Sequence, residues 1–311
     1  MMVPLALLLL AALVAALAPR VLTRADWPAR EPVLALWVWQ CAVAAVLLCC
    51  ALAMSLSAAA AWEAVRGHVF APAPHGVMEA YALGVYGSWA APLAISLAAG
   101  ALWTAAMLTR EVRRARRRRR HAALRVRSPR LPGEPRGGER LVVLESDRPD
   151  AWLLRGGAAP RLVITTAALR RLDGSQLDAV LAHEQGHARA RHDWLLHCSA
   201  ALADGFPQVP VFAAFRDQVH HLVELAADDC ASRRTGRLAT ALALVELNED
   251  RGVFGPGASG LSRLPDRVDR LLAPAPRLTV PQRLRLTAVA SLVPFVPVLV
   301  TFVPGLSALR G

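Results

Sequence analysis

The chain has 311 residues, of which 55% are hydrophobic, and a formal net charge of +12 to which lysine contributes nothing, because the sequence contains none. Such an apolar composition excludes an ordinary soluble domain and indicates a membrane protein. A basic chain also suits nucleic acid. However, no nucleic-acid-binding module or interleaving of aromatic residues accompanies the arginines, so we expect no direct contact with nucleic acid.

Four uncharged apolar stretches are each long enough, or nearly so, to cross a bilayer as a helix. They cover residues 1–19, 32–62, 80–109 and 286–309. The first stretch also fits a cleaved signal peptide, because Ala16-Leu17-Ala18 resembles a cleavage site. We favour a membrane anchor, because the stretch lacks a basic start and is followed by Arg20 and Arg24. The sequence therefore predicts four membrane helices.

The arginines after the third apolar stretch predict the orientation in the membrane. Residues 110–120 contain eight arginines, whereas the loop between the second and third stretches contains only Arg66. Because positively charged loops stay in the cytoplasm, we expect residues 110–285 to be cytoplasmic and both chain ends to lie outside. Such a segment is also attracted to anionic lipid headgroups, by about 1 kcal/mol per residue. The expected location is the cell membrane, with the lipid bilayer as a partner.

Residues 110–140 are expected to form a basic juxtamembrane segment and a linker rich in Pro, Gly and Arg, followed by a folded domain over residues 141–283. Three short stretches rich in Val and Leu open this domain and predict a small antiparallel sheet. They are Leu141–Leu144, Trp152–Leu154 and Leu162–Thr165. We expect Leu162–Thr165 to be an edge strand, to which a peptide substrate can add through main-chain hydrogen bonds.

Two longer helices follow in the predicted domain. The first is expected to start near Ser175, which pairs with Asp178 in a capping box, and to continue past Trp194. The second is expected from about Val211 to Arg233. A Gly-rich stretch over residues 252–265 is expected to be a connecting loop.

Residues 183 to 187 are His-Glu-Gln-Gly-His. On a helix, His183 and His187 project from the same face, where two imidazole nitrogens can hold one metal ion about 2 Å away. Glu184 then points beside the metal and can take a proton from a zinc-bound water, whose pKa the metal lowers to about 7. Glu184 is therefore the candidate general base of a zinc-dependent peptidase.

A catalytic zinc needs three protein ligands and one open position. Glu224, on the second predicted helix, is the expected third ligand. The alternative arrangement has a third His six residues after His187, but that position is Asp193. Asp228 lies one helical turn after Glu224 and can accept the free ring N–H of a ligating imidazole, which we expect to be that of His183.

Four other histidines lie near these residues in the sequence. His192 and His197 do not complete a familiar set of ligands, so we interpret them as surface or packing residues. His220 and His221 lie about one turn before Glu224, and one of them is a possible donor to the oxyanion of the reaction.

Together, the segments around His183, at Arg191-His192-Asp193 and over Glu224–Asp228 resemble those of the BlaR/MecR family of membrane zinc peptidases, which is related to the HtpX-type membrane proteases. The resemblance covers the four-pass layout and most of residues 140–275. It implies an α-helical multi-pass membrane protein with a cytoplasmic α+β zincin-like domain of the gluzincin type and zinc as the cofactor. BlaR/MecR proteins carry a large extracellular penicillin-binding sensor after the fourth helix. This chain stops at Gly311, so we do not expect direct sensing of β-lactams.

The favoured function is regulatory cleavage of a cytoplasmic repressor or of a membrane-associated regulator, so the expected partner is a protein substrate. An HtpX-like role in the quality control of membrane proteins fits the same residues. A non-catalytic membrane scaffold is a third interpretation. It predicts the loss of at least one catalytic group, whereas the two histidines, two glutamates and one aspartate of the predicted site are all present.

Overall fold

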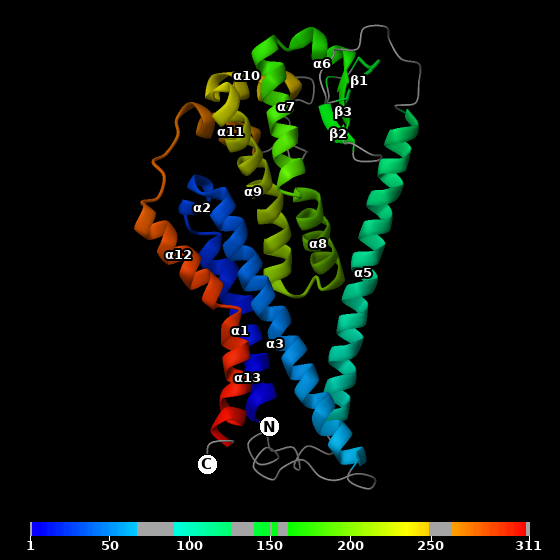
Figure 1. Cartoon of the computed structure of the whole chain (residues 1–311), viewed down its shortest axis with the longest axis vertical. Coiled ribbons are helices and arrows are strands. Elements are labelled where there is room, and N and C mark those ends of the chain that lie inside the picture. Colours follow the sequence, from blue (N-terminus) through cyan, green and yellow to red (C-terminus); the bar gives the residue numbers. More distant parts are fainter. Residues whose placement is uncertain are drawn as a thin grey trace. The chain divides into compact units, whose positions relative to one another are not determined.

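The computed structural model of the chain describes residues 2–66, 90–125, 140–147, 149, 151–154, 161–248 and 263–308 (Figure 1). This part of the chain is mostly helical, and the chain divides into two compact units. The first unit contains residues 1–109, 198–219 and 278–311, and the second contains residues 110–197 and 220–277.

Apolar helices dominate the first unit. They are α1 (Met2–Leu22), the short α2 (Trp27–Arg30), α3 (Pro32–Arg66), the first part of α5 (Ala90–Arg125), α12 (Val280–Leu292) and α13 (Phe295–Ala308). Among the described residues, three stretches are long and apolar enough to span a membrane, namely Val3–Leu22, Pro32–Ala60 and Ala91–Arg114. They overlap the first three expected spans. Residues 80–89 of the third expected span lie outside the described residues.

The fourth expected span is bent. α12 and α13 are long enough to cross a membrane only if they form one span together. They meet at an angle of 44°. Pro294 lies at the break between them. It has no N–H for the helical ladder, and its ring crowds the preceding turn, which explains the bend. Within this unit, α1, α12 and α13 all pack against α3.

A three-stranded sheet opens the second unit. Its strands are β1 (Arg140–Leu144), β2 (Ala151–Leu154) and β3 (Arg161–Thr165), and their order in the sheet is β1-β3-β2. β1 is parallel to β3, and β2 is antiparallel to β3. The expected antiparallel sheet with Leu162–Thr165 at its edge is therefore wrong, because β3 is the central strand. The side chains of Val163 and Ile164 are completely buried, as befits a strand that is paired on both sides.

The helices of the second unit begin with α6 (Thr166–Arg171) and α7 (Gly174–Arg189) and continue with α10 (Arg237–Asn248) and α11 (Leu264–Leu272). α8 (His192–Gly205) and α9 (Pro210–Thr235) are each divided between the two units. α9 confirms the second expected helix. Helices α10 and α11 were not expected from the sequence. Residues 252–262 of the expected loop lie outside the described residues.

The first expected helix, α7, starts at Gly174, as expected near Ser175, but its expected capping residues and its expected C-terminal end are wrong. Its capping box is formed by Asp173 and Gln176: Oδ1 of Asp173 accepts from the Gln176 amide at 2.7 Å, and Oε1 of Gln176 accepts from the Asp173 amide at 3.0 Å. α7 then ends at Arg189 instead of continuing past Trp194. Arg191 has a φ of 52°, in the left-handed region that an α-helix cannot contain, and α8 starts anew after it.

The core of the second unit holds α7 in place. It is formed by Ile164 of β3, Ala168 and Leu172 at α6, Ala179 and Val180 of α7, and Ala243 of α10. Helix α7 contacts both α10 and β2. The apolar side of α7 is thus fixed by its neighbours, so the polar residues farther along the same helix have a defined position.

We predict that Asp173→Ala lowers the melting temperature by a few degrees and speeds amide hydrogen exchange in the first turn of α7, because the Gln176 amide loses its acceptor. Ser175→Ala is the matched control. The Ser175 hydroxyl only donates to Asp173 Oδ1, so its loss should leave these amides protected. Hydrogen exchange monitored by mass spectrometry distinguishes the two variants, and equal exchange in both would contradict the cap.

Candidate metal centre

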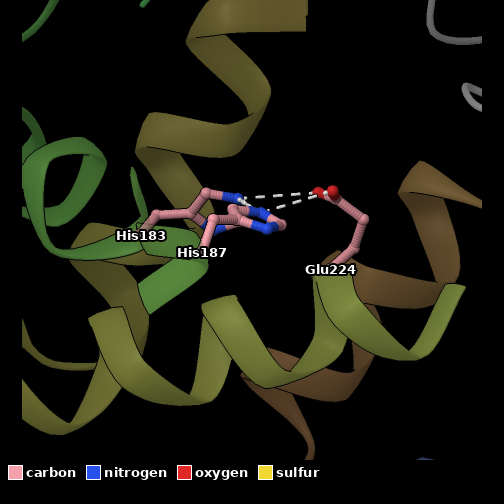
Figure 2. A group of neighbouring side chains, drawn as sticks. All are labelled: His183, His187 and Glu224. Carbon is pink, nitrogen blue, oxygen red and sulfur yellow. Dashed lines mark hydrogen bonds and ion pairs between the residues drawn. The ribbon is translucent and has the colours of Figure 1, made fainter. Parts of the chain in front are cut away.

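Three side chains from two helices meet in the second unit. His183 and His187 extend from α7, and their rings face the carboxylate of Glu224 on α9 (Figure 2). The two Nε2 atoms are 3.1 Å apart. Oε2 of Glu224 lies 3.5 Å from Nε2 of His183, and its Oε1 lies 3.4 Å from Nε2 of His187. The structure thus brings together the three ligands expected from the sequence.

The spacing of these atoms fits a tetrahedral metal ion. Ligand atoms about 2.0–2.1 Å from zinc, at tetrahedral angles, are about 3.4 Å apart. The two Nε2 atoms are 3.1 Å apart, and a different oxygen of Glu224 faces each histidine, at 3.5 Å from His183 and 3.4 Å from His187. Two imidazoles and one carboxylate are also a set that zinc accepts in catalytic sites, where the fourth position stays open. The donor set therefore fits zinc.

Asp228 supports His183 from the side away from the Nε2 atoms. Its Oδ1 lies 3.0 Å from Nδ1 of His183, and its side chain is only 1% exposed. This is the partner that the sequence analysis expects. Because Nδ1 donates its proton to Asp228, Nε2 is the ring nitrogen of His183 that faces the other candidate ligands, and a metal that binds there displaces the Nε2 proton.

The charges of the site reinforce one another. Burial lowers the pKa of His183, but hydrogen bonds to Asp228 and Glu224 outweigh this effect and raise it to about 10. Burial raises the pKa of Glu224, but the bond to His183 and the charge of Arg267 lower it to about 2. The pKa of Asp228 also falls well below its ordinary value. Both carboxylates are therefore ionised at neutral pH, as metal binding requires.

Arg267 is a site residue that the sequence analysis missed. It lies on α11, and its Nε and Nη2 donate to Oδ2 and Oδ1 of Asp228, each at 2.8 Å. Its Nη1 lies 3.0 Å from Oε2 of Glu224. One guanidinium thus holds the candidate ligand and the carboxylate behind His183 at once. Arg267 is far from the motif in sequence, and no spacing rule pointed to it.

His192 is a second missed residue, interpreted from the sequence as a surface or packing residue. It is buried, and its Nδ1 lies 2.9 Å from Nδ1 of His187. In an unbroken helix, a residue five positions after His187 would point about 140° away from it. The left-handed turn at Arg191 removes this restriction. Because α7 ends before Arg191, earlier than expected from the sequence, His192 can turn back and contact His187.

Gly186 allows α7 and α9 to approach closely at the motif. A Cβ atom at this position would lie 3.1 Å from Cβ of Cys230 and 3.4 Å from Cα of Ala227, tighter than an ordinary contact. A side chain at Gly186 would therefore require Cys230 to shift by a few tenths of an ångström. Cys230 thus lies in the contact between the two helices.

This region of the chain is similar to a known peptidase family. Residues 111–257 match the model of Peptidase family M48. The matched range includes both histidines and both carboxylates of the site and supports the M48 family, which suggests a metallopeptidase. The match does not distinguish the BlaR/MecR type from the HtpX type. Comparisons with curated proteins and with solved structures gave no match.

A pocket opens at the candidate metal site. It is lined by Glu184, by His183 and Glu224, and by residues of α10 and β2. Glu184 follows His183 on α7, so a carboxylate and two of the candidate ligands face one space. The role of Glu184 as general base stays a prediction.

His220 and His221 differ in their surroundings. His220 is exposed, whereas His221 is half-buried and lies one turn before Glu224. Burial, and then the charges of Arg263 and Arg267, lower the pKa of His221 to about 4, so its ring is neutral at neutral pH and has one N–H to donate. Neither residue is among those that line the pocket. The role of an oxyanion donor stays a prediction for both.

We predict that Arg267→Met strongly destabilises the metal-free protein, by about 3–5 kcal/mol, because it leaves the buried Asp228 without its bidentate partner. Arg270→Met on the same helix is the matched control. It removes the 2.8 Å pair with Asp229, whose side chain is more exposed, so its effect should be smaller. Thermal and denaturant unfolding of the two variants measure the difference. Equal stability of both variants would refute a special role for Arg267.

Proposed function

We propose that the protein is a membrane-embedded zinc endopeptidase. One observation carries this proposal: the metal-binding atoms of His183, His187 and Glu224 lie within 4.8 Å of one another, and Glu184 lines the same pocket. The match of residues 111–257 to an M48 peptidase supports it.

His183, His187 and Glu224 would hold the zinc ion. When bound, zinc lowers the pKa of a coordinated water to about 7 and polarises a substrate carbonyl. Asp228 keeps the Nδ1 proton of His183 in place, so that Nε2 stays available. Arg267 holds one oxygen of Glu224, which limits the rotation of that carboxylate.

Glu184 performs the proton transfers. Its carboxylate accepts a proton from the attacking water while the water oxygen forms a bond to the carbonyl carbon of the peptide. The carbon–nitrogen bond then breaks, and Glu184 passes the proton to the leaving amine. His221 or His220 is proposed to donate a hydrogen bond to the carbonyl oxygen as negative charge develops there.

The proposed substrate is a cytoplasmic or membrane-associated protein, cleaved as part of regulation. β2 supports an extended substrate segment, because it lies at the end of the strand order β1-β3-β2 and its first residue, Ala151, lines the pocket. A peptide can add to such an edge through main-chain hydrogen bonds. β2 thus takes the place that the sequence analysis assigned to Leu162–Thr165.

We predict that Glu184→Gln retains about one zinc per chain but loses hydrolysis by 10²-fold or more, because the amide cannot accept the water proton while the ligands are untouched. Metal analysis and cleavage of a casein-type protein are measured on the same preparation. The control is the double variant His183→Ala/His187→Ala, which should lose both zinc and activity. Undiminished zinc in the control, or cleavage by Glu184→Gln at the wild-type rate, would refute the assignment.

We propose that the M48 domain faces the cytoplasm, because the arginines after Thr109 outnumber those of the other loops between apolar stretches. A reporter that works only inside the cell should therefore be active when inserted near Gly257. A reporter that works only outside should be active when fused after Gly311. The opposite pattern would invert the topology and direct the search for substrates to envelope proteins.

A further inference from the structure

The pocket beside the metal centre has a second, apolar half. Its walls come from α7, through Ala179 and Val180, and from α10, through Ala243, Leu244 and Leu247. We propose that this half binds the side chain of the substrate residue next to the scissile bond and selects an apolar side chain no larger than a phenyl group. The inference rests on the proposed peptidase function and adds a substrate class to it.

The apolar half is part of the folded core and is therefore rigid. Ala179, Val180 and Ala243 are at most 6% exposed and belong to the core of the second unit. Leu244 and Leu247 are half-buried, and both face the pocket from neighbouring turns of α10. A charged side chain entering here would lose its hydration, with no partner among these five residues. The walls thus favour aliphatic and aromatic groups.

The position of the apolar half fixes which substrate residue it can bind. Val180 lies one helical turn before His183 and Glu184 on α7, and all three line the same pocket. A carbonyl placed against Glu184 therefore has its neighbouring side chain within one helical turn of the apolar wall, about 5 Å.

The size of the pocket sets the upper limit. Its volume is about 170 Å³, and this value includes the polar half around Glu224 and Asp228. An apolar cavity of roughly 150 Å³ holds a benzene molecule. Once the polar half is occupied by the reacting peptide, we expect the remaining space to favour an aliphatic side chain or a phenyl ring over an indole.

Polar residues at the pocket have partners of their own. The Thr240 hydroxyl donates to the Gly236 carbonyl at 2.8 Å, and the Asn248 amide donates to the Leu244 carbonyl at 2.7 Å. Arg267 is occupied by Asp228 and Glu224. These donor groups are engaged within the protein, so at the five apolar residues shape and apolar contact select the substrate side chain.

The test is the cleavage profile of the full-length, zinc-loaded protein in detergent. A synthetic peptide library is digested, and mass spectrometry identifies the residues that flank each cut bond. The wild type should prefer Val, Leu, Ile or Met, and Phe more weakly, at one flanking position. Leu247→Ala widens the pocket and should raise the ratio of kcat/KM for Trp over Val by at least about tenfold, since one methylene in such a pocket changes this ratio by 10–200-fold.

Two further variants make the result specific. Leu244→Ala should shift the profile in the same direction, which keeps the test valid if Leu247→Ala fails to fold. Leu242→Ala is the matched control, because Leu242 is on the same helix but 43% exposed and does not line the pocket. Its profile should equal that of the wild type. An unchanged profile in both pocket variants, with an active wild type, would overturn the inference.

A separate measurement distinguishes failure of this inference from failure of the proposed function. If the zinc-loaded wild type cleaves no peptide, the peptidase proposal fails. The pocket is then judged by binding of fluorescent peptides to Glu184→Gln, with Leu, Gly or Asp at one central position. Binding of the Leu peptide about tenfold tighter than that of the Gly and Asp peptides supports the apolar pocket. Equal binding of all three overturns it.

Discussion

The candidate metal centre depends on the pairing of one buried carboxylate, that of Asp228. It is 1% exposed, and a buried charge is tolerated only when it is paired and hydrogen-bonded. Its partners come from two other helices: His183 on α7 and Arg267 on α11. One side chain of α9 thus ties three helices together. The need to pair the Asp228 carboxylate therefore both holds α7 and α9 together and orients the candidate ligand His183.

The dependence extends to the neighbouring ligand. Arg267 cannot leave Asp228 without also leaving Glu224, because one guanidinium contacts both carboxylates. His187 has a separate support in His192, which is brought back to it by the turn at Arg191. Each candidate ligand therefore has its own partner behind it, and this arrangement is expected of sites that must bind zinc with one position open.

The parts of the site that follow from helical spacing could be predicted from the sequence. His187 lies four positions after His183, and Asp228 lies four positions after Glu224, so each pair lies on one face of its helix whatever the tertiary structure. Helix α9 itself was predicted within two residues at each end. These features depend on local geometry alone.

The features that depend on tertiary contacts could not be predicted. Three short apolar strands carry no signal for which one is central, and β3 is central because both of its neighbours pair with it. Arginine has no special preference for a positive φ, so the sequence gives no sign that α7 ends before Arg191. Arg267 lies 39 residues after Asp228, beyond the reach of any periodicity.

Helix α7 contributes both to the candidate metal centre and to the wall of the apolar pocket. This limits how the preference for substrate side chains can change. Val180 of α7 and Ala243 of α10 belong both to the core and to the pocket wall, so enlarging either side chain would strain the packing of the unit. Leu244 and Leu247 are half-buried and contribute less to the core, so they can vary at a lower cost in stability. Differences in substrate preference among proteins with this arrangement should therefore arise first on α10, while α7 stays fixed by its histidines.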